Sequence, residues 1–321
     1  MALGTAHVTQ TTNANYIPEL WLMEVIAAYK ANNVMRGLVT LFNHNKKKGD
    51  TLHIPNFTRS LASSKAVETE VTLVAPTHGI TNITIDQHFH YAKLIEDFAE
   101  IQSLSSHRQA YMDDAGYAIG RQVDFALHVL GTGYQGATLD ATPGTPDANT
   151  LLYTGGSPGA VIGSDGNTSW SNLDGGNGAA LADAGVRRSM RRLDDVNVPL
   201  TGRAWVVPPV TREALLGIPR YTEQAFVGDG SAIRTGQIGN LYGSPVMVST
   251  DCGTTQDLSA GSTYRAVLYF HKSAVALAEQ LRPRAQTQYI LQHLGNLFVV
   301  DTIYGTAELR NDAGVTLIVP A

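Results

Sequence analysis

The chain has 321 residues, of which 43% are hydrophobic and only 16% are charged, and its formal net charge is −5. An average soluble domain carries about 25% charged residues, so this balance argues against a disordered chain. The pI of 6.0 is unlike that of a dedicated nucleic-acid binder, and a single cysteine excludes an intrachain disulfide. We expect neighbouring subunits to cover much of this weakly charged surface.

The N-terminal region carries no signal peptide, and no apolar run approaches the ~20 residues needed to cross a bilayer. We therefore expect a soluble protein that is made inside the cell. Residues 2–15 are small and polar, which predicts an extended arm. Residues 20–30 have apolar side chains at helical spacing and predict a short amphipathic helix.

Two strands and a long connection follow. Residues 46–50 are typical of a turn, and residues 51–55 alternate like a short strand. A polar stretch at 58–77 interrupts the alternation, which resumes at 80–86 and continues through 89–94. So long a loop is uncommon in a compact domain and is usually functional. Because it has few large apolar residues, we expect it to rest on another surface.

The clearest helix follows this excursion. Apolar residues recur at helical spacing from about Ser106 to Leu130, and Gly131 and Gly133 predict its end. About twenty-five residues at ~1.5 Å each give a length near 36 Å, which is long for a globular helix.

The second half of the chain mixes strands and helices. Residues 134–178 are rich in glycine and small polar residues, with a possible small hairpin around 151–153, and a helix is predicted from about 179 to 194. Further strands are predicted at 203–207, 246–248, 264–271, 286–291, 297–304 and 315–319, and further helices at 211–216 and 272–280. Sheet and helix are segregated rather than alternating, so the fold class is α+β.

Three glycine-containing motifs match part of a known catalytic or binding pattern, but each fails a requirement of that pattern. Residues 131–136 fit the dinucleotide fingerprint but follow a helix, whereas that fingerprint requires a strand before it. Residues 155–159 fit the nucleophile elbow, but Pro158 has no N–H for an oxyanion hole. Residues 165–176 begin like a calcium loop, yet Trp170 occupies the obligatory glycine position.

His88 and His90 lie on one face of a predicted strand, and His78 precedes them. A zinc site would need further ligands, for which only Asp86 or Glu96 is near, without a recognisable spacing. We favour a half-exposed strand face over a metal site, and we expect no bound metal and no cofactor.

Four arginines make the predicted helix at 179–194 locally basic: Arg187, Arg188, Arg191 and Arg192. Lys46, Lys47 and Lys48 form a second basic spot. Contact with nucleic acid needs only such positive charge. Aspartates flank the arginines, however, so ion pairing within or between subunits is the favoured interpretation.

The order of these elements resembles that of a tailed-bacteriophage (Caudoviricetes) major capsid protein with the Hong Kong 97-type fold. Four local stretches support the resemblance, which covers nearly the whole chain. They are the strand entry at 196–209 (VNVPLTGRAWVVPP), the stretch at 235–246 (TGQIGNLYGSPV), HKSAVALA at 271–278, and Tyr304-Gly305 with Arg310.

The resemblance implies a division of the chain. Residues 1–43 would be an N-terminal arm and 44–85 an extended loop lying across a neighbouring subunit. Residues 86–130 and 281–321 would form a peripheral domain with the spine helix, and 131–280 an axial domain. It also implies an icosahedral shell of hexamers and pentamers, assembled in the host cytoplasm, that encloses double-stranded DNA without sequence-specific binding in the virion.

The resemblance further implies a portal and leaves open whether a decoration or cement protein binds. We expect a separate scaffolding protein, because the arm and loop account for everything before the spine helix. Lys65 is the only lysine well inside the loop, but no motif supports a crosslink there. We expect inter-subunit contacts from Trp21, Lys46, Lys47, Lys48, Arg59, Lys65, Glu68, Glu70, Arg187, Arg188, Arg191, Arg192 and Arg234.

Two other functions remain as alternatives to a structural capsid protein without enzymatic activity. One is an encapsulin-like nanocompartment shell, which shares the fold but encloses a protein cargo. The other is a histidine-dependent metal enzyme that would use His78, His88 and His90.

Overall fold

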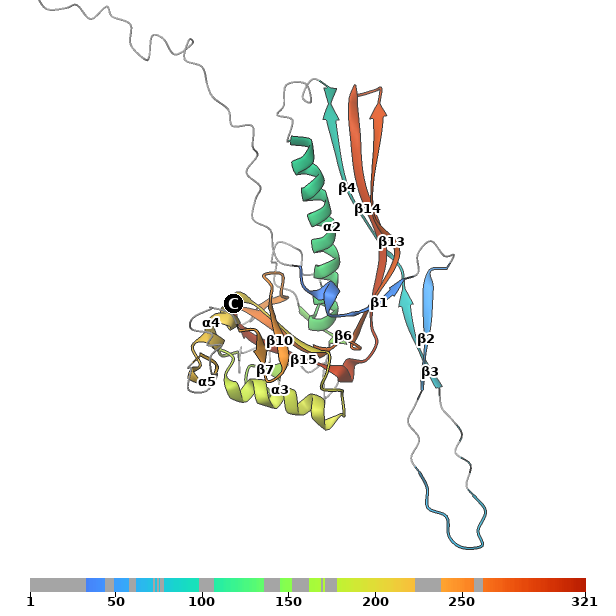
Figure 1. Ribbon diagram of the computed structural model, residues 1–321, viewed down its shortest axis with the longest axis vertical. Helices are drawn as coiled ribbons and strands as arrows, with labels where there is room; N and C mark the ends of the chain where they lie inside the picture. The colour runs from blue at the N-terminus through green and yellow to red at the C-terminus, as the bar shows by residue number, and fades with distance from the viewer. Residues whose placement is uncertain are drawn as a thin grey trace, which may run out of the picture.

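The computed structural model describes residues 33–43, 49–57, 62–71, 73, 75, 78–97, 107–135, 145–151, 162–168, 170, 178–222, 238–256 and 262–321. The molecule is elongated (Figure 1). A four-stranded sheet and a long helix lie side by side along the long axis. A lobe built on a seven-stranded sheet lies at one end of them, and a two-stranded hairpin projects past that lobe.

The four-stranded sheet has the order β1-β13-β14-β4. Its strands are β1 (Thr40–Asn43), β13 (Val275–Ile290), β14 (Gly295–Glu308) and β4 (Gln87–Glu96). β13 and β14 form a long antiparallel pair, and β4 adds to β14 in the antiparallel sense. β1 is short and parallel to β13, so it covers only the first part of that strand.

The helix α2 (His107–Thr132) confirms the long helix predicted from sequence, and it packs on one face of this sheet. Ala115 and Ile119 meet Phe298 and Val300 of β14 in a buried cluster. At the other end of α2, Leu127 enters the main core of the lobe. The helix therefore joins the sheet to the lobe, as Figure 1 shows.

Polar side chains near the C-terminal end of α2 hold two connecting segments. Asp124 is buried and accepts a hydrogen bond of 2.7 Å from the backbone N–H of Met35, in the 3-10 turn η2 (Met35–Gly37). Arg121 donates to the buried carboxylate of Asp251 at 2.9 Å. Burying such charges is costly unless they are paired, so these contacts fix where η2 and residues 249–252 lie against the helix.

The projecting hairpin consists of β2 (Thr51–Phe57) and β3 (His78–Thr84). Its base is anchored by apolar packing, because Ile83 and Ile85 are buried against Ala276 and Ala278 of β13. Where the base of the hairpin passes β14, Gly305 of β14 lies directly against the turn from β3 to β4. A Cβ on Gly305 would come within 2.2 Å of the carbonyl oxygen of Thr84.

The seven-stranded sheet has the order β7-β15-β12-β8-β10-β9, with β11 also paired to β12. Its strands are β7 (Ile162–Gly163), β15 (Gly314–Pro320), β12 (Thr263–His271), β8 (Arg203–Val207), β10 (Ser244–Val248), β9 (Asn240–Leu241) and β11 (Thr254–Gln256). Trp205 and Tyr269, which are cross-strand partners, stack at 4.1 Å in the fully buried centre.

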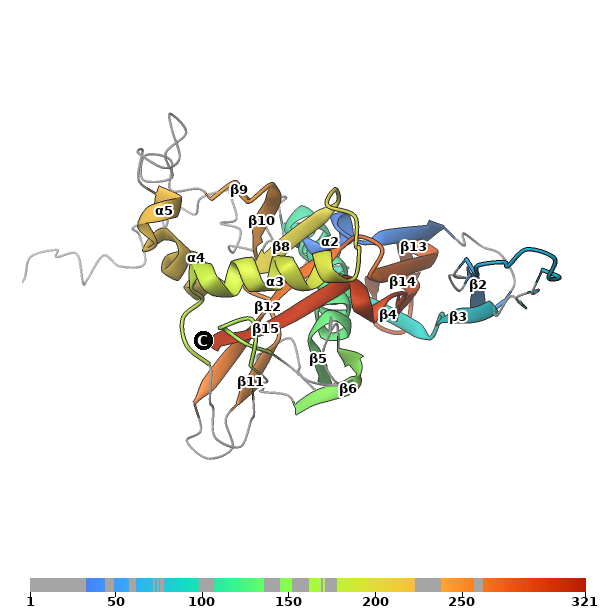
Figure 2. The ribbon, with the colours of Figure 1, turned by 90° about the horizontal axis from the view of Figure 1, so that it is seen from below.

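Three helices flank this sheet: α3 (Asp183–Asp195), α4 (Pro209–Leu216) and α5 (Pro219–Thr222). Figure 2 shows α3 lying across the strands of the lobe. The remaining short elements are β5 (Gly133–Gln135), β6 (Thr145–Leu151) and the 3-10 turn η4 (Asn311–Ala313).

The turn from α3 to β8 explains part of the motif at 196–209. Arg203 is almost fully buried and donates to the backbone carbonyls of Val198 at 2.6 Å and Pro199 at 2.9 Å. It also pairs with Asp194 at 2.7 Å. Gly202 has a φ of 85°, a left-handed conformation that favours glycine. The motif therefore fixes the turn that connects α3 to β8.

One predicted element is wrong. Residues 272–280 were expected to form a helix, but β13 begins at Val275 and that part of it is buried between β1 and β14. Its alanines and leucine favour a helix by propensity, yet a buried central strand is a continuous apolar run that periodicity cannot distinguish from a helix. The other predicted strands from 51 onward, and the helices at 179–194 and 211–216, have counterparts in the structure. The small hairpin predicted around 151–153 falls mostly outside the described residues. The helix predicted at 20–30 lies outside the described residues.

Sheet membership does not change at residue 281, where the expected boundary between axial and peripheral domains falls. β13 runs through this position, and the C-terminal strand β15 belongs to the seven-stranded sheet instead of the four-stranded one. The described part of the G-x-G-x-x-G run, residues 131–135, lies at the end of α2 and in β5, so a helix and not a strand comes directly before it.

The close approach at Gly305 generates a stability prediction. We expect Gly305→Ala to lower the free energy of unfolding by about 1–3 kcal/mol, the usual cost of forcing an extra carbon into a packed site. Gly116→Ala on α2 is the matched control, because its added Cβ meets nothing within 4 Å, and it should stabilise by about 0.5–1 kcal/mol. Urea unfolding followed by circular dichroism measures both. Equal midpoints for the two variants would contradict the close approach of Gly305 to the carbonyl of Thr84.

Candidate assembly surfaces

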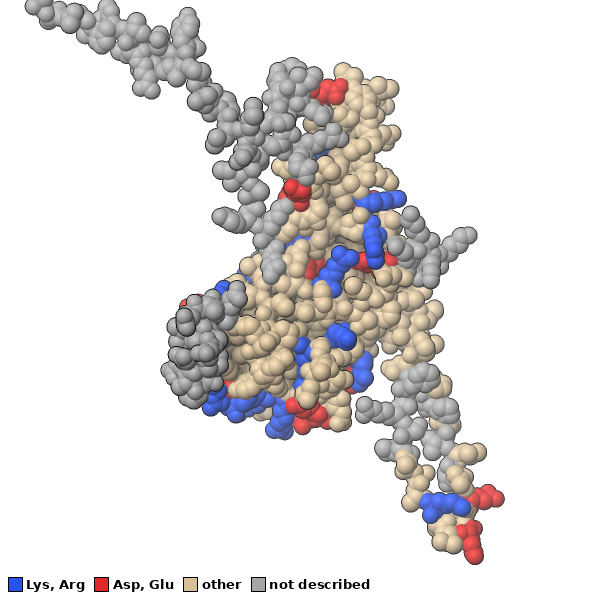
Figure 3. All heavy atoms as spheres, viewed as in Figure 1, with Lys and Arg blue, Asp and Glu red and all other residues tan. Residues whose placement is uncertain are grey.

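The structure separates the residues predicted to make inter-subunit contacts into two groups. Lys65, Glu68 and Glu70 lie at the outer end of the hairpin, where Figure 3 shows an isolated group of charged atoms. The four arginines predicted together all lie on α3. The other predicted residues lie outside the described part of the chain: Trp21, Lys46, Lys47, Lys48, Arg59 and Arg234.

The outer end of the hairpin exposes large apolar side chains. Val67 is 90% exposed, Leu73 91% and Val71 68%. A turn closes the end, with the backbone N–H of Thr69 donating to the carbonyl of Ala66 at 3.4 Å. These side chains have no core of their own, so only another surface could remove their apolar area from water.

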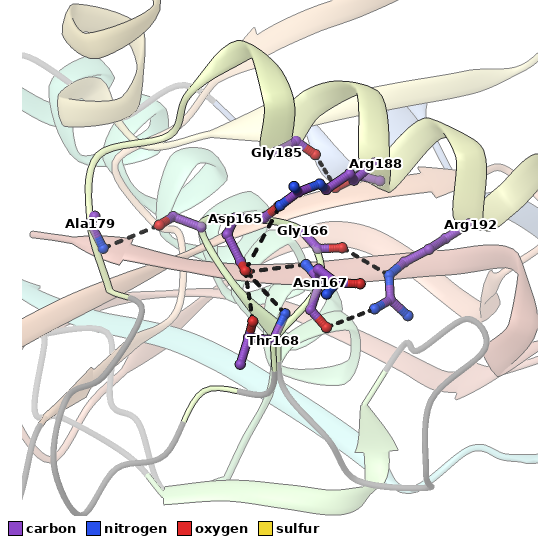
Figure 4. Close-up of polar contacts among 10 residues, drawn as sticks. Asp165, Gly166, Asn167, Thr168, Ala179, Gly185, Arg188 and Arg192 are labelled. Carbon is purple, nitrogen blue, oxygen red and sulfur yellow. Dashed lines mark hydrogen bonds and ion pairs between the residues drawn. The ribbon is translucent and has the colours of Figure 1, made fainter.

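The arginines of α3 first serve the chain's own fold (Figure 4). Arg192 donates to the carbonyl oxygens of Gly166 at 2.9 Å and Asn167 at 3.1 Å. Arg188 donates to the carbonyl of Asp165 at 3.0 Å. These contacts hold the loop after β7 against α3. They are mostly hydrogen bonds to backbone carbonyls, whereas the ion pairs expected for the basic helix are seen for Arg187 with Asp183 and for Arg191 with Asp195.

Asp165 organises that loop from within, and this explains the resemblance to the start of a calcium site. Its carboxylate accepts hydrogen bonds from the backbone N–H groups of Asn167 and Thr168, both at 3.0 Å, and from the Thr168 hydroxyl at 2.7 Å. Burial opposes ionisation, but these bonds and the charge of Arg188 outweigh it and lower the pKa of Asp165. Backbone and side-chain donors of the loop thus occupy the positions a cation would need.

Asp183, in the first turn of α3, joins four side chains. Its carboxylate accepts hydrogen bonds from the hydroxyls of Tyr221 at 2.6 Å and Tyr242 at 2.7 Å. Arg187 donates to it at 2.9 Å and Arg220 at 3.0 Å. Burial alone would raise the pKa of Asp183, but the tyrosine hydrogen bonds and the arginine charges outweigh it, so the pKa is lowered.

Arg191 differs from its neighbours because it is largely free of the fold. Its side chain is 80% exposed, and its 3.3 Å ion pair joins it to Asp195, which is itself 63% exposed. It lines a cavity of about 450 Å³ together with Gly166, Asn167, Arg188, Arg192, Asp195 and Val196. Of the four arginines, Arg191 is thus the one most available to a partner.

Sequence reasoning missed a third surface, the far half of β13. Residues 282–289 are exposed, although they form part of a regular antiparallel pair. At the end of this pair Leu291 is 78% exposed and Leu294 63%. The sequence does indicate a strand exposed on both faces here, because Arg-Ala-Gln-Thr-Gln-Tyr at 284–289 has strand alternation without an apolar face.

The chain matches the phage capsid protein family over residues 19–319. It belongs to this family. Three solved structures resemble it: a chain from Mycobacterium phage Che8 (21% identity, TM-score 0.69, covering 94% of this chain and 97% of that one), the capsid of cyanophage P-SCSP1u (19%, 0.72, 99% and 96%), and the capsid of cyanophage Pam1 (14%, 0.70, 99% and 99%). No curated protein matches.

Family membership and fold agree with the resemblance read from sequence, and the chain is a major capsid protein with the Hong Kong 97-type fold. The nanocompartment and metal-enzyme alternatives are not favoured. Within the described ranges no group of three or more histidine, cysteine or acidic side chains could hold a metal ion. His88 instead lies 3.7 Å from Asp301. Among the same residues, no helix is long and apolar enough to span a membrane.

The Asp183 cluster generates a prediction for this capsid protein. Asp183→Asn should lower the free energy of unfolding at pH 7 by about 1–3 kcal/mol, because hydrogen bonds to a charged group are lost. A lowered pKa gives stability that is present above the unfolded pKa of about 3.9 and is lost as the pH falls through the folded value. The difference from wild type should therefore shrink below about pH 4.

Asp195→Asn is the matched control, since the exposed pair of Asp195 with Arg191 should change stability by at most about 1 kcal/mol. Thermal unfolding from pH 3 to 7 measures both variants. A deficit of Asp183→Asn that stays constant over this range would contradict the role given to the carboxylate.

Proposed function

We propose that the chain assembles, as hexamers and pentamers, into the icosahedral shell that encloses the double-stranded DNA of a tailed phage. The observation that carries this proposal is the hairpin, whose outer end exposes Val67 and Leu73 by about 90%. The apolar end of this projection stays exposed to water unless another copy covers it. The hairpin thus matches the role that the resemblance gives to residues 44–85.

The domain roles follow the same reasoning. The lobe with its seven-stranded sheet would surround the five-fold and six-fold vertices as an axial domain. The four-stranded sheet with α2 would form the periphery. The formal net charge of −5 suits a container that must not hold its DNA tightly. DNA would be enclosed without sequence-specific contacts.

The proposal includes partners that the resemblance implies. Assembly would take place in the host cytoplasm on a separate scaffolding protein, with a portal at one vertex for DNA entry. The shell protein itself would have a structural role without catalysis.

Particle contents test this function. We expect the expressed protein and its scaffold to sediment as uniform shells tens of nanometres across in electron micrographs. Particles from infected cells should contain nuclease-protected double-stranded DNA. A chain that remains monomeric with its scaffold would contradict the proposal. Particles that hold a protein cargo instead of DNA would identify a nanocompartment.

Arg191 provides a test of the predicted contacts on α3. Because Arg191 is 80% exposed and its ion pair with Asp195 is exposed as well, Arg191→Glu should leave the melting temperature nearly unchanged. If α3 faces a neighbour, the variant should reduce the yield of shells in sucrose gradients, and Arg191→Lys should restore it. Arg212→Glu, an equal charge change at an exposed position of α4, serves as the control. Equal yields for Arg191→Glu and Arg212→Glu would remove Arg191 from the interface.

A further inference from the structure

Three arginines of α3 line one cavity at the surface of the lobe. Arg188, Arg191 and Arg192 are spaced three and four residues from the first of them, which places them on the same face of the helix. Asp195 is the acidic residue among the described residues that line the cavity, so three positive charges and one negative charge leave a formal charge of +2. In Figures 1 and 3, Lys and Arg atoms gather along the side of the lobe where α3 lies.

Two of these guanidinium groups are held in place by the fold. Arg188 donates to the carbonyl of Asp165 at 3.0 Å, and Arg192 donates to the carbonyl of Gly166 at 2.9 Å (Figure 4). The loop that supplies these carbonyls lies tightly against the helix, because a Cβ on Gly166 would come within 2.7 Å of the carbonyl oxygen of Gly185. Side chains that are already fixed lose little further freedom when a ligand binds.

The chain itself neutralises the positive charge of this cavity only in part. Asp195 pairs with Arg191 at 3.3 Å, but both side chains are exposed. The carboxylate of Asp165 lies 4.0 Å from Arg188 and accepts hydrogen bonds from its own loop. The pKa of Arg192 is lowered, chiefly by burial and further by the charge of Arg191, so these two effects outweigh the nearby carboxylates. An anion in the cavity would oppose them.

The chemistry of the lining fits a phosphate group. A guanidinium presents five N–H donors in a planar fork that matches phosphate oxygens. Among the described residues, the contacts of Arg188 and Arg191 use one N–H group each. A phosphate group at pH 7 carries about 1.5 to 2 negative charges, which balances the formal +2 of the lining. A single carboxylate would leave half of that charge unbalanced.

We propose that Arg188, Arg191 and Arg192 form a binding site for phosphate in the cavity between α3 and the loop after β7. The phosphate oxygens would accept from the three guanidinium groups, and the ligand would displace the carboxylate of Asp195 from Arg191. Two sources share this chemistry: inorganic phosphate, and successive phosphodiesters of nucleic acid, which carry one charge each. All three arginines belong to one chain, so the site does not require an assembled shell.

The melting temperature of the unassembled full chain, measured at rising concentrations of inorganic phosphate and constant ionic strength, tests the site. A ligand that binds the folded state raises this temperature. Phosphate also stabilises proteins by exclusion from their surface, so the informative quantity is the difference between variants. Sodium chloride at the same ionic strength serves as the reference.

Arg191→Gln removes the most exposed of the three guanidinium groups. Because the Arg191 side chain is 80% exposed, the melting temperature without phosphate should stay nearly unchanged. The phosphate concentration needed for a given rise should increase at least about tenfold, the factor for one hydrogen bond to a charged group. Arg212→Gln, an equal charge change at an exposed position of α4 outside the cavity, is the matched control and should respond like wild type.

Asp195→Asn should act in the opposite direction. It removes the carboxylate that competes for Arg191 and makes the lining more positive, so a lower phosphate concentration should produce the same rise. Glu213→Gln, at an exposed position of α4, makes the same charge change outside the cavity and should have no effect. An equal phosphate response of wild type, Arg191→Gln and Asp195→Asn would overturn the site.

A short fluorescently labelled DNA duplex identifies the source of the phosphate. If phosphodiesters fill the site, Arg191→Gln should weaken binding of the duplex in fluorescence anisotropy, and the slope of log affinity against log salt should fall by about 0.9. If the site takes inorganic phosphate alone, Arg191→Gln should change the phosphate response and leave the binding of DNA as in wild type. Either result supports a phosphate site.

Shell assembly provides the remaining distinction. A loss of shells in Arg191→Gln, with both the phosphate response and the binding of DNA unchanged, would assign this arginine to a contact with a neighbouring copy, and the phosphate site would be wrong. Since the binding measurements use the unassembled chain, their failure would leave the proposed shell function standing. Failure of wild type to form shells would count against that function and not against the phosphate site.

Discussion

The antiparallel pairing of β13 with β14 is the constraint on which the rest of the structure depends. β1 and β4 add to its two sides, α2 packs on one of its faces, and the hairpin base crosses it at Gly305. The pair is also joined to the lobe at both chain ends, because β12 leads into β13 and β14 leads through η4 to β15. A change in this register would therefore shift the hairpin and the lobe relative to each other, since one residue of slip turns every side chain to the opposite face.

β13 and the hairpin each have a buried part, which packs within the chain, and an exposed part, which is available for contacts with other copies. Residues 275–279 of β13 are buried, whereas 282–289 are exposed. The hairpin repeats this division, with Ile83 buried at its base and Leu73 exposed at its outer end. Burial of apolar area contributes roughly 25 cal/mol per Å², so the buried halves stabilise the chain. The exposed halves can contribute only when copies meet.

The sequence predicted the elements whose periodicity is strong and local. The long helix and the strands of the hairpin base were confirmed because their apolar spacing can be read within each segment. Residues 272–280 were predicted wrongly because their strand character comes from β1 and β14, which lie far away in sequence. The ties of Arg188 and Arg192 to the loop at 165–167 were invisible for the same reason. Nothing in the local sequence says that backbone carbonyls will lie beside those side chains.

The exposed far half of β13 carries little charge. Residues 284–291 include one charged side chain, that of Arg284, and it already forms an ion pair with Asp301 of the same chain at 2.9 Å. Charged side chains on a surface that another copy covers would lose hydration, and the contact returns it only where each meets an opposite charge. A weakly charged exposed surface of this kind therefore suits the proposed shell, in which copies of the chain cover one another.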